Sequence, residues 1–125
     1  MARLPVGSDE GGLAMGVDVV LYRVVPVGPG RRRYVTAEVL PDPDDVLLGL
    51  VRRVRSSGRT PVLDRVDPVG LLVVPADRAA HLADELACLE EVARDEAEVA
   101  HVRRLDRLAR RLHEDRDVEL RFEGD

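Results

Sequence analysis

No glycine or proline occurs from Ala76 to Val118, and this absence constrains the fold more than any other feature of the sequence. Helix is the regular structure that such a stretch favours, but its apolar residues do not form one continuous face. Two apolar groups at helical spacing lie on different sides of the axis: Leu82, Leu86, Leu89 and Ala93 in the first half, and Val102, Leu105, Ala109 and Leu112 in the second. Because one straight helix cannot bury both groups against the same core, the change of face predicts two helices with a break near Arg94 to Glu98.

Four segments have the composition of β-strands. Val17 to Val25 is rich in β-branched residues and ends at Pro26, which predicts a largely buried strand. Tyr34 to Leu40 has the alternation of an edge strand, Leu71 to Val74 is a short apolar run, and Val118 to Phe122 alternates as a half-buried strand. We expect a small mixed or antiparallel sheet of three to four strands, with the first and last long strands as neighbours.

A third helix is predicted after the second strand. Asp42 is suited to cap a helix and Pro43 to occupy its first position, and the two aspartates that follow favour the positive end of the helix dipole. We expect this helix to end near Ser56, just before a glycine. The preceding segment, Val27 to Arg33, combines glycine, proline and three arginines and predicts an exposed turn or loop.

These elements predict an α+β fold. Three helices, including the C-terminal helix pair, would pack on the sheet. The 125 residues, 45% of them hydrophobic, suit a single domain with one core. Residues 1–14 show no periodicity, so we expect a flexible N-terminal tail and a single domain over residues 15–125.

The charge of the chain favours some classes of binding partner over others. All nineteen basic residues are arginine, as in a bacterial chain from a GC-rich genome, so an arginine-rich surface carries less information here than usual. The formal net charge of −5 makes nucleic acid an unlikely partner and favours an acidic domain that binds another protein or a second copy of itself.

The expected cellular location follows from sequence features that the chain lacks. Cys88 is the only cysteine, so no internal disulfide can form, and no charged segment followed by an apolar stretch opens the chain. The apolar runs are too short or too interrupted to span a bilayer. We expect a cytoplasmic protein without a membrane partner.

The densest charged cluster outside a helix is a candidate binding loop formed by Arg59, Asp64, Arg65 and Asp67. Loops at strand ends often carry sites, and paired carboxylates hold metals or act as acid and base. The alternative is a structural turn, because Asp67 to Gly70 has the residues of a type I turn. The sequence leaves both interpretations open.

Catalytic signatures are missing. The chain has no glycine-rich phosphate loop, no Gly-x-Ser-x-Gly elbow and no dinucleotide fingerprint. His81, Glu85 and Cys88 share one helical face and are zinc-ligand types, but their spacing matches no zinc motif. We therefore assign no catalytic, cofactor-binding or metal-ligating residue and no cofactor, and we favour a chain that is not an enzyme.

The last helix carries a stripe of arginines that forms a candidate interaction face: Arg103, Arg104, Arg107 and Arg111. The preceding helix is acidic instead, with Asp84, Glu90 and Glu91 among its residues. Two antiparallel helices of opposite charge would form ion pairs with each other.

Three segments of the chain resemble a family of small bacterial proteins of about this length. The segments are Met15 to Tyr22, Leu63 to Gly70 with its Asp-x-x-Asp-Pro-x-Gly pattern, and Leu120 to Asp125 with its terminal Gly-Asp. The resemblance implies a common fold frame from Met15 to Asp125 and no particular activity.

Two functions follow as expectations. The first is a non-enzymatic, acidic protein-binding domain of the immunity or accessory type, because the chain is small and lacks catalytic motifs. The alternative is a small metal- or ligand-dependent enzyme or sensor that uses the Asp64 and Asp67 loop.

Overall fold

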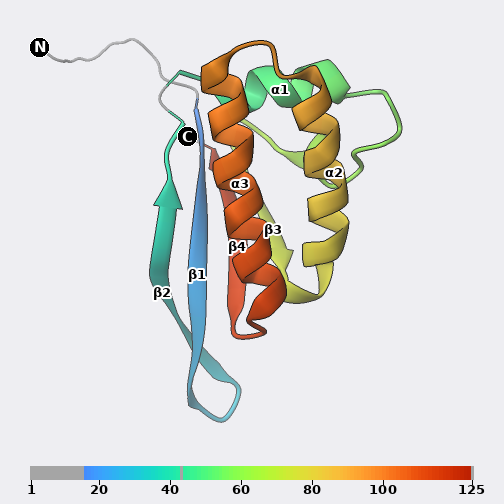
Figure 1. Ribbon diagram of the computed structural model, residues 1–125. Coiled ribbons are helices and arrows are strands. Elements are labelled where there is room, and N and C mark those ends of the chain that lie inside the picture. The colour runs from blue at the N-terminus through green and yellow to red at the C-terminus, as the bar shows by residue number, and fades with distance from the viewer. Residues whose placement is uncertain (1–15, 43, 125) are drawn as a thin grey trace, which may run out of the picture.

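The computed structural model describes residues 16–42 and 44–124. Within them, the chain forms a four-stranded antiparallel sheet with three α-helices packed on one face, so the predicted α+β fold is confirmed (Figure 1). The predicted tail, residues 1–14, lies outside the described residues.

The strand order in the sheet is β2-β1-β4-β3, which makes the first and last long strands neighbours, as predicted. Two short 3₁₀ helices, η1 and η2, were not predicted. Along the chain the elements are β1 (Val17–Gly28), β2 (Arg31–Leu40), α1 (Val46–Val54), η1 (Leu63–Arg65), β3 (Leu71–Pro75), η2 (Ala76–Arg78), α2 (Ala79–Val92), α3 (Glu96–Glu114) and β4 (Val118–Gly124).

The β1–β2 hairpin is longer than predicted. β1 continues through Pro26 to Gly28, and the arginines assigned to a loop belong to β2, with only Pro29 and Gly30 at the turn. Pro26 is tolerated because the strand pairs only with β2 at that point. Gly30 has φ 69°, a left-handed conformation that glycine adopts without strain.

The start of α1 also differs from the prediction. The helix begins at Val46 because Asp45 has φ 56° and interrupts the helical backbone. Asp42 still caps the helix: its buried carboxylate accepts hydrogen bonds from the backbone N–H groups of Val46 at 2.7 Å and Leu47 at 3.0 Å. The prediction that Asp42 binds the N–H groups at the start of α1 is therefore correct, whereas the N-cap position, which is Asp45, and the first helical residue were placed too early.

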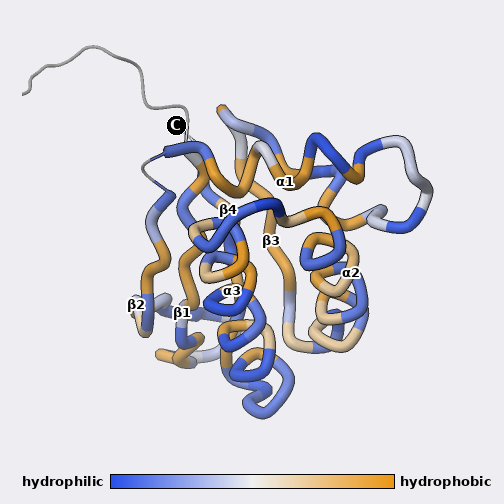
Figure 2. Tube along the Cα trace, turned by 45° about the horizontal axis from the view of Figure 1, so that its top comes forward, coloured by the Kyte–Doolittle hydropathy of each residue, from blue (hydrophilic) through white to orange (hydrophobic). Residues whose placement is uncertain are grey.

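The predicted break in the long Gly-free stretch is confirmed. α2 ends at Val92, where Ala93 turns to an extended conformation, and α3 begins after Asp95. The Asp95 carboxylate caps α3 by accepting the backbone N–H of Glu98 at 2.9 Å. In Figure 2 this connection is hydrophilic, while hydrophobic residues recur along both helices.

The core lies between the helices and one face of the sheet. It comprises side chains from every strand and helix, among them Leu21, Leu47, Leu50, Leu72, Leu82, Leu86, Leu105, Leu112, Leu120 and Phe122. Alternate residues of the strands point away from it, and their side chains form the second face of the sheet. No helix lies on that second face in the view of Figure 1.

Candidate functional site

The candidate binding loop is held by contacts within the protein. Arg59 forms a bidentate ion pair with Glu91 of α2, with N–O distances of 3.2 and 3.1 Å. This hydrogen bond and the charge of Arg59 lower the pKa of Glu91 below its ordinary value. Asp64 accepts a hydrogen bond from the Thr60 hydroxyl at 2.9 Å.

The loop ends in a hydrogen-bonded turn at Asp67 to Gly70, where the sequence predicted a turn. Gly70 N–H donates to the Asp67 carbonyl at 3.2 Å, and the Asp67 carboxylate accepts the backbone N–H of Val69 at 2.9 Å. Arg65 is exposed. The structure thus directs Arg59, Asp64 and Asp67 to separate partners, and none of the three clefts described below is lined by these residues.

Glu85 stabilises the beginning of the same loop from α2. Its carboxylate is 2% exposed and accepts the backbone N–H groups of Val62 at 3.1 Å and Leu63 at 2.9 Å. His81 lies 3.2 Å from it, and the buried Cys88 faces the carbonyl of its own helix at Asp84. Glu85 thereby caps η1. In the described part of the chain, no group of three His, Cys, Asp or Glu residues is arranged to hold a metal ion.

The arginine stripe of α3 lies on the outer side of the helix layer. Arg111 pairs with Glu38 of β2, whereas Arg103, Arg104 and Arg107 are exposed and form no ion pair with the described residues. The expected pairing with the acidic helix is wrong for residues 16–42 and 44–124, because no ion pair there joins α2 to α3. Glu91 of α2 is bound by Arg59 instead.

A partly buried ion pair joins α1 to the connection between α2 and α3. The Arg53 guanidinium donates to both carboxylate oxygens of Glu98 at 2.7 and 2.6 Å, and also to the Val92 carbonyl at 3.0 Å. The hydrogen bond from Arg53, together with one from the backbone N–H of Arg94, lowers the pKa of Glu98 to about 2. This pair has a structural role, because its hydrogen bonds join three elements of the helix layer.

From the sequence, with charged neighbours around it, His101 of α3 is expected to be solvated; this is wrong, because the residue is buried. His101 is 5% exposed and its Nε2 atom is buried without a hydrogen-bond partner. Burial lowers the pKa of His101 below its ordinary value; the charge of Asp42 opposes this effect and that of Arg104 adds to it. The other buried residues of α3 are apolar, so the ring packs with them against the core in its neutral form.

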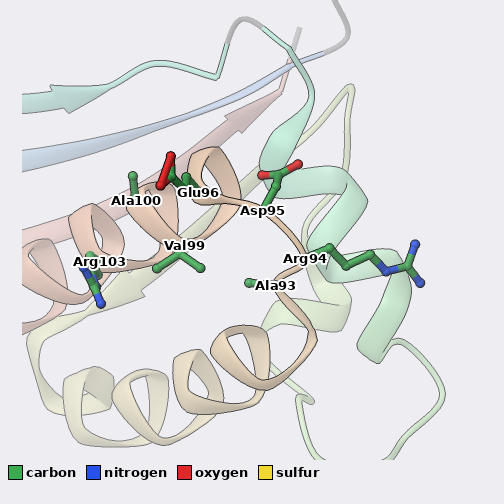
Figure 3. Close-up of a pocket in the computed structure, with 7 residues that line it drawn as sticks. All are labelled: Ala93, Arg94, Asp95, Glu96, Val99, Ala100 and Arg103. Carbon is green, nitrogen blue, oxygen red and sulfur yellow. The ribbon is translucent and has the colours of Figure 1, made fainter.

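The largest described cleft is a depression of about 540 Å³ beside the α2–α3 connection. Ala93 and Val99 point into it, while Arg94 extends away over α1 (Figure 3). Two carboxylates line it: Asp95 is engaged as the cap of α3, and Glu96 is the exposed first residue of that helix. The depression lacks convergent polar groups, and its walls offer neither a nucleophile nor an acid and base pair.

A second cleft, of about 110 Å³, lies between α2 and α3. A third, of about 310 Å³, lies where the β1–β2 hairpin leaves the sheet. Arg32 and Arg116 contribute cations to the third cleft, and its apolar lining includes Val24, Pro26 and Val118.

The most distinctive surface is the face of the sheet opposite the helices, which we call the open sheet face. The strand registers place its side chains in rows, and one row crosses all four strands in the order Val39, Val20, Arg121 and Val73. The open sheet face comprises Asp18, Val20, Tyr22, Tyr34, Thr36, Val39, Leu71, Val73, Glu119, Arg121 and Glu123.

Arg121 is the centre of this face. Its guanidinium carbon lies 4.9 Å from the ring centre of Tyr22 and 4.4 Å from that of Tyr34, and its Nε donates to Glu119 at 2.6 Å. Burial disfavours the charge, but Glu119 and the two tyrosines outweigh it and raise the pKa of Arg121 above its ordinary value. The cation therefore persists between two aromatic rings.

The two tyrosines are themselves fixed by contacts with their neighbours. Their rings meet edge to face at a centroid distance of 6.4 Å, and the Tyr22 hydroxyl donates to Glu123 at 2.7 Å. That hydrogen bond raises the pKa of Tyr22 above its ordinary value. Sequence reasoning missed this cluster because Arg121 of β4 is far in the chain from the β1–β2 hairpin that carries Tyr22 and Tyr34.

No helix of the described residues is both long enough and apolar enough to cross a membrane. Comparison of the chain with protein-family models, with curated proteins and with solved structures finds no match.

Proposed function

We propose that the protein is a non-enzymatic binding domain, of the immunity or accessory type, which binds a partner protein through the open sheet face. The observation that carries this proposal is the combination of exposed apolar side chains with a fixed Tyr-Arg-Tyr cluster on a sheet face without a helix layer. Leu71 is 58% exposed, Val39 50% and Val73 41%.

The side-chain types support a binding role. Tyrosine and arginine are enriched at the centres of protein interfaces, where they account for a large part of the binding free energy. Tyr22, Tyr34 and Arg121 form one contiguous group, and the valines of the central row flank it. Large exposed apolar residues gathered on one face, rather than scattered singly, mark interaction sites.

The rigidity of the cluster supports the same conclusion. Glu119 and Glu123 hold Arg121 and Tyr22 through hydrogen bonds, so these side chains are already ordered before a partner arrives. Ordering a long side chain costs roughly 0.5–1.5 kcal/mol on binding. A preformed cluster avoids part of that cost.

The charge of the face indicates the kind of partner. The open sheet face carries three carboxylates, those of Asp18, Glu119 and Glu123, around the cation of Arg121, and the whole chain has a formal net charge of −5. Electrostatic complementarity therefore favours a protein whose surface is basic and partly apolar. The partner we propose is a basic protein rather than a nucleic acid.

The test is a binding comparison between two sets of valine substitutions. The double variant V39R/V73R places two cations on the open sheet face, whereas V35R places one on the opposite side of β2, at a valine of similar exposure. The immobilised chain is incubated with native lysate, and the retained protein is identified and quantified. Circular dichroism confirms that each variant is folded.

We expect the wild-type chain and V35R to retain one basic protein in stoichiometric amount. We expect V39R/V73R to retain less than about a tenth of it, since two repelling charges at an interface centre cost more than about 1.4 kcal/mol. Equal retention by V39R/V73R contradicts the proposal, as does a wild-type chain that remains solitary at micromolar concentration.

A further inference from the structure

The β1–β2 hairpin projects beyond the rest of the sheet as a two-stranded arm, residues 24–35 (Figure 1). The pairing of β1 with β4 ends at Arg23 and Val118, and the backbone N–H of Val24 donates to the Asp117 carbonyl at 2.7 Å. Beyond that point β1 pairs with β2 alone. The arm is therefore exposed on both faces.

The charge of the arm is opposite to that of the molecule. Arg31, Arg32 and Arg33 follow one another in β2, and residues 24–35 contain no acidic residue, although the chain as a whole is acidic. None of the three forms an ion pair with the described residues. With three consecutive arginines and no acid, the arm is a basic segment of an acidic chain.

The arm is also an open sheet edge. β2 is the outer strand, all its residues from Arg31 to Val39 are exposed, and within the described residues no strand pairs with its outer side. Such an edge presents backbone N–H and C=O groups that can pair with an added strand. Side chains alternate along β2, so Arg32 lies on the face opposite to Arg31 and Arg33.

A cleft of about 310 Å³ lies at the base of the arm. Its apolar lining comes from the arm and from β3 and β4, namely Val24, Pro26, Pro75 and Val118, and its charged lining comprises two cations, Arg32 and Arg116, and two acids, Asp117 and Glu119. The cleft supplies apolar surface beside the arm, whereas the charge preference of the arm rests on Arg31, Arg32 and Arg33.

We propose that the arm binds an extended acidic segment of a protein, which adds as a strand to the outer edge of β2. Apolar exposure favours this occupant over a nucleic acid: Val27 is 47% exposed, Tyr34 41% and Val35 42%. Interfaces with nucleic acid are more polar, and the acidic body of the molecule repels a long polyanion. The outer edge of β2 is a different surface from the open sheet face, although Tyr34 belongs to both the arm and that face, and the proposal does not depend on the proposed function.

The experiment measures fluorescence anisotropy of labelled peptides with the full chain. The first peptide has about twelve residues that alternate glutamate and valine, enough to pair with the ten residues of β2. A second peptide replaces glutamate by lysine. A third repeats the first with N-methyl groups on alternate amides, which removes the donors of one strand edge while leaving its charge and the protein unchanged. A DNA duplex of roughly 20 base pairs is the fourth probe.

Two triple variants of equal net charge separate local from overall electrostatics. R31S/R32S/R33S removes the cations of the arm, whereas R103S/R104S/R107S removes three exposed cations of α3. We expect the acidic peptide to bind and to weaken as salt rises. We expect at least about a tenfold loss with the arm variant and less than about a twofold loss with the α3 variant.

The N-methylated peptide decides whether a strand is added. We expect it to bind at least about tenfold more weakly than the unmodified acidic peptide, because several backbone hydrogen bonds are lost. Equal binding of the two acidic peptides overturns the proposal. Equal binding of the lysine peptide, or tighter binding of the duplex than of the acidic peptide, overturns it as well.

Discussion

The backbone N–H of Gly124 donates to the carbonyl oxygen of Gly70 at 2.8 Å, which closes the end of β4 against the Asp67–Gly70 turn. The two residues are far apart in the sequence: Gly70 ends the Asp-x-x-Asp-Pro-x-Gly pattern, and Gly124 belongs to the terminal Gly-Asp. A Cβ atom at Gly124 would overlap backbone atoms of Asp67 and Pro68. The contact gives both motifs a structural explanation, because a turn and a glycine are needed where the two backbones meet.

The first prediction tests this contact. G124A forces the turn away from β4, and we expect it to lower the free energy of unfolding by at least about 2 kcal/mol in urea denaturation. The matched control is G49A in α1, where a Cβ meets nothing within 4 Å and the backbone is helical. There we expect a gain of roughly 0.5–1 kcal/mol, since alanine favours helix over glycine. A loss in G124A no larger than about 0.5 kcal/mol contradicts the close approach.

The buried carboxylate of Glu85 gives the second prediction. E85A leaves the backbone N–H groups of Val62 and Leu63 without their acceptor, so we expect a loss of about 1.5–3 kcal/mol in the free energy of unfolding. E90A, at an exposed position of the same helix, should change it by less than about 0.5 kcal/mol. If the two variants are equally stable, the cap on η1 does not contribute as described.

His101 makes stability depend on pH near neutrality. Its pKa in the folded protein lies below the ordinary value of 6.5, so the unfolded chain binds more protons between the two values. Stability is therefore full above 6.5 and falls as the pH drops through this window. H101L should flatten that part of the profile of urea midpoints, whereas H113L, at an exposed site of α3, should not. An unchanged slope in H101L assigns the effect to another group.

Glu98 also makes the stability fall as the pH falls, but at lower pH than His101 does. Its pKa of about 2 in the folded protein lies below the ordinary 4.5, so the stabilisation by its bonds to Arg53 and Arg94 is complete above 4.5. It is lost as the pH falls toward about 2. E98Q should show a shallower loss of stability than wild type over this interval, and E96Q should follow the wild-type curve. A steep E98Q profile would show that the Arg53 pair is not responsible.

Local sequence signals predicted most of the fold. The change of apolar face identified the break between α2 and α3, because helical periodicity is encoded in neighbouring residues. The start of α1 was placed incorrectly because Asp42 caps the helix from four residues ahead of Val46, across a left-handed Asp45 that the sequence did not signal. The arginines of the hairpin were taken for a loop because composition alone does not show that a strand continues past the core.

Local sequence signals could not predict the open sheet face. Tyr22, Tyr34 and Arg121 meet only through the register of three strands, and register depends on contacts that are distant in sequence. Alternation in β4 did predict that one face of the last strand would be exposed. It did not indicate which side chains from the neighbouring strands would join Arg121 there.

The tyrosines allow a direct measurement of partner binding, because Tyr22 and Tyr34 are the only tyrosines of the chain and both lie on the open sheet face. Incorporation of 3-fluorotyrosine gives two ¹⁹F NMR signals that report on this surface alone. We predict that both signals shift or broaden when the basic partner retained by the wild-type chain is added, and that they do not respond in V39R/V73R. Two unperturbed signals in a complex that demonstrably forms would place the partner elsewhere and contradict the account.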